Sequence, residues 1–141
     1  MSANSTEMLQ PTFRLTSAAA KTVLAAAEKE ASSNGWNVTV AIVDAGGIPV
    51  FVKRSDGAFA ASYEIAVGKA KTAAQFSKNT ARLEASINTS ARRTALLSAP
   101  FVLMQGGVPL IVNGICCGAV GVSGVKPNED EKVALAGVNA L

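Results

Sequence analysis

Three charged residues in the middle of the chain offer the chemistry of anion binding and acid–base catalysis. Arg54 ends a β-rich run, and its guanidinium could hold a carboxylate by two parallel hydrogen bonds. Glu64 and Lys69 follow in a helix-like segment, where their spacing points them about 140° apart and predicts no simple helix-face ion pair. Lys69 has apolar neighbours, so it is a candidate acid, base or anion anchor. The alternative is a lysine that extends its amine to solvent.

A second candidate lies where Gln105, Gly106 and Gly107 interrupt an apolar run shortly before Pro109. Two successive glycines allow backbone N–H groups to converge on a carboxylate or a developing oxyanion. A wide turn is the alternative interpretation. We predict one site in which Arg54 and the 105–107 turn bind substrate while Glu64 and Lys69 move protons. Its residues are Arg54, Glu64, Lys69, Gln105, Gly106 and Gly107.

Histidine is absent from all 141 residues. This excludes Ser-His-Asp and Cys-His catalysis and any imidazole ligand for zinc or haem iron. The two cysteines, Cys116 and Cys117, are adjacent and lack metal-ligand spacing. We therefore expect no metal site and no resident cofactor. The cysteines are expected to be buried free thiols, because a disulfide between neighbouring residues is strained.

Length and composition predict one domain. Of the residues, 49% are hydrophobic and 16% charged, which excludes an intrinsically disordered chain. We expect a flexible tail over residues 1–14 and a single domain over 15–141. The apolar run at 102–112 is far too short to span a bilayer, and residues 1–15 do not resemble a secretory signal. The expected location is cytoplasmic, without membrane contact.

Positive charge is concentrated between Lys53 and Arg93, where eight residues are basic and three acidic. Nucleic-acid binding usually requires a denser basic stripe, commonly with more aromatic residues than Phe59, Tyr63 and Phe76. We therefore expect no nucleic-acid partner. A small anionic ligand held by one or two of these cations is the preferred interpretation.

Capping signals and hydrophobic periodicity predict the elements that must position these residues. Thr16 and Gly35 begin and end the first expected helix, Ser62 caps the second, and Asn128 caps the last. Asn113-Gly114 is a hairpin-turn signal. The expected helices cover 16–34, 61–76, 80–88 and a last one from 128, and the expected strands cover 36–44, 48–53, 101–104, 109–112 and 115–122. This order favours an α+β layered domain with a five-stranded antiparallel sheet.

Short motifs lie in a fixed order along residues 15–141. They are Val43-Asp44-Ala45-Gly46-Gly47, Arg54-Ser55-Asp56-Gly57-Ala58, Glu64-Ile65-Ala66, Lys69-Ala70, Thr72-Ala73, Gly106-Gly107-Val108-Pro109-Leu110, Asn113-Gly114 and Gly118-Ala119-Val120-Gly121-Val122-Ser123-Gly124. In this order they resemble the GlcG/HbpS family, which includes the C-terminal domain of PduO-type proteins. The resemblance implies a profilin-like fold, a homo-oligomer, and haem binding or, in some members, haem degradation.

Two classes of function follow. The preferred one is a cofactor-independent catabolic enzyme, a hydrolase or tautomerase acting on a small unsaturated or imine carboxylate. The alternative, from the resemblance, is a haem-binding or haem-degrading protein. Without histidine, haem would need Tyr63, Met104, a cysteine, or contacts to its propionates alone. A structural accessory protein without a pocket is the third possibility.

Overall fold

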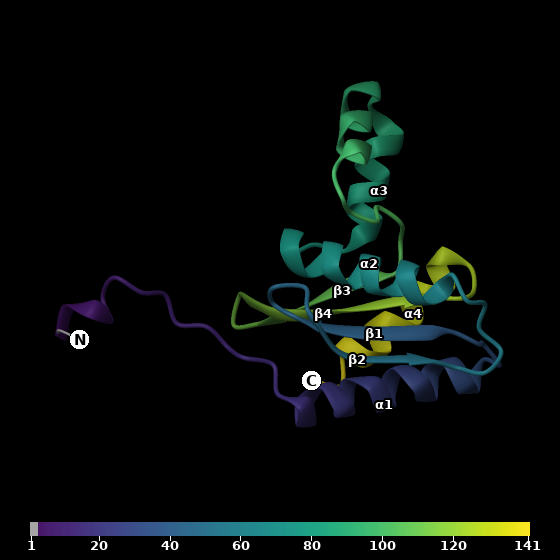
Figure 1. Ribbon diagram of the computed structural model, residues 1–141, viewed down its shortest axis with the longest axis horizontal. Helices are drawn as coiled ribbons and strands as arrows, with labels where there is room; N and C mark the ends of the chain where they lie inside the picture. The colour runs from purple at the N-terminus through teal and green to yellow at the C-terminus, as the bar shows by residue number, and fades with distance from the viewer. Residues whose placement is uncertain (1–2) are drawn as a thin grey trace.

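The structure, a computed structural model, describes residues 3–141. Residues 3–14 include a short 3-10 helix, η1 (Ala3–Ser5), and lead away from the folded body (Figure 1). Residues 1 and 2 of the expected flexible tail lie outside the described residues. The remaining elements are α1 (Ser17–Ser33), β1 (Thr39–Asp44), β2 (Pro49–Arg54), α2 (Ser62–Phe76), α3 (Thr80–Thr89), the 3-10 helix η2 (Ala91–Ser98), β3 (Gly107–Val112), β4 (Ile115–Ser123) and α4 (Pro127–Val138).

The strands form one antiparallel sheet in the order β2-β1-β4-β3. Its two hairpins close as expected from their turn residues. Asp44 Oδ1 accepts hydrogen bonds from the N–H groups of Gly46 and Ile48, and Asn113 and Gly114 both adopt the left-handed conformation of the predicted turn. The hairpin turns therefore follow directly from local sequence.

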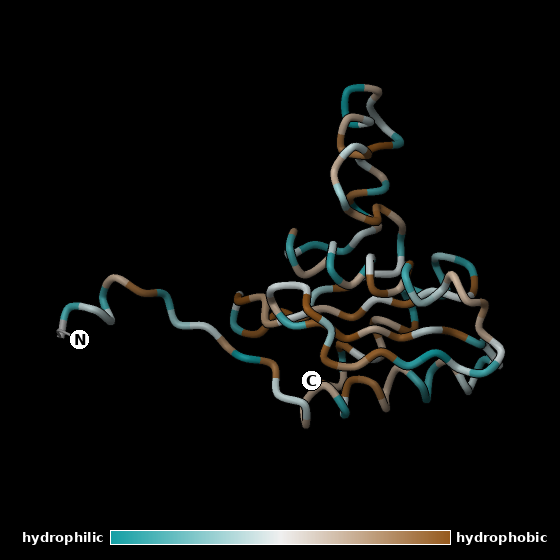
Figure 2. The backbone as a smooth tube through the Cα atoms, viewed as in Figure 1, coloured by the Kyte–Doolittle hydropathy of each residue, from teal (hydrophilic) through white to brown (hydrophobic). Residues whose placement is uncertain are grey.

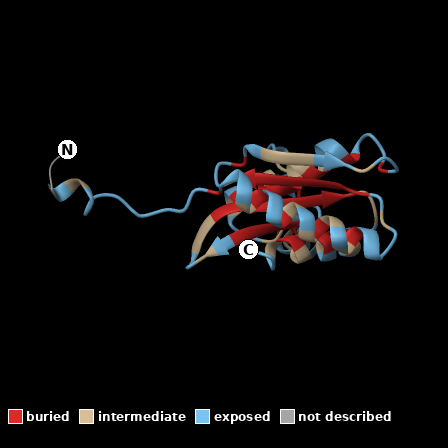
Figure 3. Ribbon diagram, turned by 90° about the horizontal axis from the view of Figure 1, so that it is seen from below, coloured by how far each residue is buried: buried red, intermediate tan, exposed pale blue. Residues whose placement is uncertain are grey.

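The sheet separates two layers of helices. On one face, α1 and α4 cover a core of Val and Ala side chains, and on the other α2 covers a core built mostly of alanine (Figure 1). The strands form the middle layer and carry much of the hydrophobic sequence (Figure 2). β1, β3 and β4 are largely buried, whereas the edge strand β2 is half-buried or exposed (Figure 3). The fold is thus the expected α+β layered arrangement. In contrast, α3 and η2 project away from the α2 side (Figure 1).

Small residues bring α2 into direct contact with β4. A Cβ atom at Gly121 would overlap the carbonyl oxygen of Ala66 and the amide nitrogen of Ala70. The Gly-rich strand β4 therefore packs closely against a helix of the same chain.

The expected fifth strand is wrong: among the described residues the sheet has four strands, and 101–104 is not one of them. The Val102 N–H donates to Thr72 Oγ1 at 3.0 Å, and the Gln105 N–H donates to Glu84 Oε2 at 3.2 Å. Because helix side chains satisfy these backbone donors, the segment runs beside α2 and α3 as a connector without a strand partner.

Two of the predicted helix caps also differ. Thr16 caps α1 as expected, since its Oγ1 accepts from the Ala19 N–H at 3.1 Å. Ser62 is the first residue of α2 and does not cap it, and α4 begins at Pro127, one residue before the predicted cap Asn128. Within residues 3–141, no helix combines the length and the apolar character that crossing a membrane requires.

Candidate functional site

Arg54 lies at the end of β2, beside the start of α2. It is paired across the sheet with Thr39, and directly opposed side chains share one face of a sheet. The Thr39 hydroxyl lies 2.7 Å from the Ser62 hydroxyl in the first turn of α2. Arg54 is therefore on the α2 face of the sheet, with its side chain exposed.

The first turn of α2 is fixed by Ser62. Its N–H and its hydroxyl both donate to the carbonyl oxygen of Phe59, at 3.0 and 2.6 Å. This arrangement leaves the rings of Phe59 and Tyr63 about half exposed, at 52% and 49%. Val67, one turn further, and Val52 of β2 both pack against the alanine-rich cluster between α2 and the sheet.

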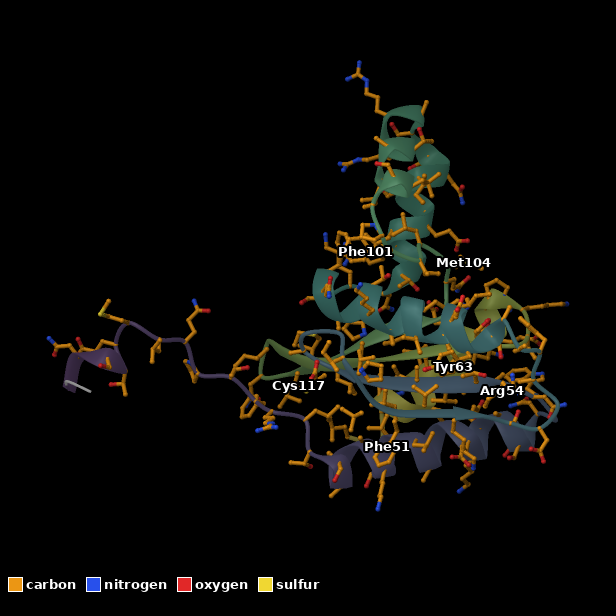
Figure 4. The ribbon with its side chains drawn as sticks, viewed as in Figure 1. Phe51, Arg54, Tyr63, Phe101, Met104 and Cys117 are labelled. Carbon is orange, nitrogen blue, oxygen red and sulfur yellow. The ribbon has the colours of Figure 1, made fainter. Side chains whose placement is uncertain are left out.

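We call Arg54, Phe59, Tyr63 and the exposed Glu64 the Tyr63 surface. Arg54 and Tyr63 lie at the same end of the molecule (Figure 4). The Phe59 ring, the Tyr63 phenol and the Arg54 guanidinium suit a flat ligand that carries a carboxylate. Two predicted site residues and the tyrosine named for haem are thus all exposed, Arg54 at the end of β2 and Tyr63 and Glu64 in the first turn of α2.

Lys69 has a different environment. Its side chain is 1% exposed, and its ammonium donates to Asp130 Oδ2 at 3.0 Å and to the Val122 carbonyl at 2.8 Å. Asp130 Oδ1 accepts from the Val125 N–H at 3.1 Å. Burial raises the pKa of Asp130, while the Lys69 ammonium and the hydrogen bonds oppose that rise. The pair joins α2, β4 and the start of α4.

The 105–107 turn closes over this ion pair. Gly106 has a φ of +129°, and a Cβ there would come within 2.7 Å of Lys69 Nζ. The Gly107 N–H donates to Thr80 Oγ1 at 2.9 Å, and the Gln105 N–H donates to Glu84. These two N–H groups, which the sequence suggested for binding an anion, therefore already donate to side chains of the protein.

The predicted site therefore divides into two places. Lys69, Gly106 and Gly107 meet in the interior, whereas Arg54 and Glu64 are exposed at the Tyr63 surface. Sequence reasoning missed Asp130, although the apolar neighbours of Lys69 had made it a candidate acid, base or anion anchor. A partner 61 residues further along the chain leaves no local signal for the pair.

The other candidate iron ligands named from the sequence are the cysteines and Met104. Both thiols are free, and the Cys117 thiol is buried and donates to the Leu110 carbonyl. Burial raises the pKa of Cys117, which disfavours the thiolate that a metal would need. Met104 is 40% exposed at the end of the connector. Within residues 3–141, no cluster of three or more His, Cys, Asp or Glu residues could hold a metal ion.

This chain is similar in sequence and in structure to several known proteins. A family model described as "Haem degrading protein HbpS-like" matches residues 15–139. The chain is 38% identical over 105 residues to Protein GlcG of Escherichia coli (strain K12). The aligned residues cover 74% of this chain and 77% of GlcG. The HbpS crystal structure is 32% identical and superposes with a TM-score of 0.87, covering 100% of this chain and 99% of HbpS. The PduOC:Heme complex is 28% identical, with a TM-score of 0.81 and coverage of 92% and 96%.

Proposed function

The chain belongs to the HbpS-like family, and on that premise we propose that it binds haem at the Tyr63 surface. The observation that carries the proposal is the likeness, over 92% of the chain, to a structure whose name states a bound haem. The proposal favours the alternative of the sequence analysis over the cofactor-independent hydrolase or tautomerase. The small anionic ligand expected from the charge pattern is then haem itself, through its propionates.

The side chains at this surface fit the group. Tyrosine phenolate holds haem iron in catalase, and Tyr63 offers a half-exposed phenol in a chain without histidine. The Phe59 ring can lie against the macrocycle, and the Arg54 guanidinium can bind a propionate. When bound, haem supplies a redox-active iron. The residues of this chain bind and orient it.

An absorbance titration with hemin tests the proposal. We expect a saturable shift of the Soret band with one hemin per chain. Tyr63→Phe removes one oxygen atom and should weaken binding about tenfold or more, because it deletes the iron ligand. Met104→Leu, the matched control at the other exposed candidate ligand, should bind like the wild type. No saturable shift, or a Tyr63→Phe variant with unchanged affinity and spectrum, would overturn the proposal.

The catalytic roles of Glu64 and Lys69 stay predictions. Glu64 is exposed beside Tyr63, where it can exchange a proton with a bound molecule. Lys69 is enclosed with Asp130 beside the 105–107 turn, so its amine is not accessible to a ligand in this structure. The geometry therefore favours Glu64 over Lys69 as a proton carrier.

A further inference from the structure

A cavity of about 420 Å³ lies on the other face of the sheet, between the end of α1 and strands β1 and β2. Its walls include the apolar side chains of Ala31, Val38 and Val40 and the indole of Trp36. The Trp36 N–H donates to the Ala31 carbonyl at 2.9 Å, which ties the residue to the end of α1. The volume lies within the range of small-molecule sites. None of the residues of the Tyr63 surface lines this cavity.

Five polar residues line the same cavity, among them Glu28, Lys53 and Ser55. Lys53 Nζ donates to Glu28 Oε2 at 2.7 Å, in a pair that is partly open to solvent. An ammonium has three donors, so Lys53 can bind an anion while it keeps Glu28. The Ser55 hydroxyl oxygen is buried and makes no hydrogen bond with any described residue. The Ser55 N–H donates to the Val38 carbonyl at 3.1 Å, which fixes the backbone of that serine.

We propose that this cavity is a second ligand site, which takes a small planar aromatic carboxylate with a second polar group. The ring packs against Trp36, the large apolar lining residue that is still partly exposed, and apolar surface of both would be removed from water. The carboxylate binds the Lys53 ammonium, and the second polar group pairs with the buried Ser55 hydroxyl. A hydroxybenzoate has this combination of groups.

The chain contains a single tryptophan, so its fluorescence reports on this cavity directly. The probe is 4-hydroxybenzoate, with benzoate as the analogue that lacks the hydroxyl. We expect saturable quenching of Trp36 by both, with tighter binding of 4-hydroxybenzoate. Benzyl alcohol, which lacks the carboxylate, should bind much more weakly.

Two variants and one control separate the contacts. Lys53→Gln should weaken the binding of both carboxylates about tenfold or more. Lys29→Gln, which removes an exposed charge of α1 outside the cavity, should leave their binding unchanged. Ser55→Ala should weaken the binding of 4-hydroxybenzoate severalfold and leave the affinity for benzoate unchanged. Circular dichroism checks that each variant is folded.

The proposal is overturned if the wild type shows no saturable quenching, or if Lys53→Gln and Lys29→Gln bind alike. It is independent of haem binding, because Tyr63→Phe should retain 4-hydroxybenzoate and Lys53→Gln should retain hemin. Each proposal can therefore fail without the other.

Discussion

A single buried ammonium links three parts of the molecule. Lys69 lies on α2, Val122 on β4, and Asp130 in the first turn of α4. Removing one partner of a buried pair leaves an uncompensated charge, which costs more than the pair itself contributes. Lys69 is therefore a structural link between elements as well as the candidate acid or base that its sequence position indicated.

Lys69→Met should lower the free energy of unfolding by about 3–5 kcal/mol, because it leaves the Asp130 carboxylate buried without its cation. Urea denaturation measures the change. Glu64→Gln, an exposed position on the same helix, is the control and should stay within about 0.5 kcal/mol of the wild type. A Lys69→Met variant as stable as that control would show that the pair is not a structural link.

Cys117 makes stability depend on pH in the alkaline range. Burial first, and then the neighbouring Cys116, raises the pKa of this thiol above its ordinary value, so the folded chain keeps a proton that the unfolded chain releases. The unfolding free energy should therefore fall as pH rises above about 9. Denaturation curves between pH 8 and 10 should show a steeper loss for the wild type than for Cys117→Ala. Equal slopes would contradict a buried, neutral thiol.

At the scale of elements, glycine and alanine set the distance between α2 and the sheet. The helix backbone lies directly over Gly121, with Ala66 and Ala70 as its nearest residues. This contact holds α2, and hence Tyr63 in its first turn, in a fixed position over β1 and β4.

Gly121→Ala should destabilise the fold by about 1–3 kcal/mol or more, because its new Cβ overlaps helix backbone that cannot rotate away. Gly46→Ala is the control: a Cβ there makes only an ordinary 3.4 Å contact with Asp44 Oδ1. Thermal denaturation of the two variants should separate them clearly. Similar melting temperatures for the two variants would mean that the α2 backbone does not pack directly against Gly121.

Elements defined by local patterns could be predicted from the sequence. The two hairpins and α2 are of this kind, since turn residues and periodicity act over a few positions. The 101–104 segment has strand-like composition, but its backbone partner is Thr72 Oγ1, 30 residues away. The site follows the same rule: Arg54 at a strand end was predictable, whereas the Lys69–Asp130 pair depends on contacts between distant segments.

For the whole molecule, the sheet separates two surfaces of different chemistry. The Tyr63 surface lies on the α2 side, and the Trp36 cavity lies on the α1 side. A third feature is the projection formed by α3 and η2, in which η2 has no buried residue and Leu97 is 63% exposed. Such a projection suits contact with another copy of the chain.

We expect a homo-oligomer, as the sequence resemblance implied, with the α3–η2 projection in the subunit contact. Light scattering at micromolar concentration should give a multiple of the 14.3 kDa chain mass. Leu97→Glu should shift the population toward smaller species, because it places a charge in the contact. A monomer mass for the wild type would contradict the prediction.

Resonance Raman spectroscopy of the ferric complex, made with ring-deuterated tyrosine, shows whether Tyr63 is the ligand of the haem iron. Tyr63 is the only tyrosine of the chain, so any isotope-sensitive band belongs to it. We predict phenolate bands, coupled to the iron, that shift with the label and vanish in Tyr63→Phe. A hemin complex whose spectrum is identical with and without the label would show that Tyr63 does not bind the iron.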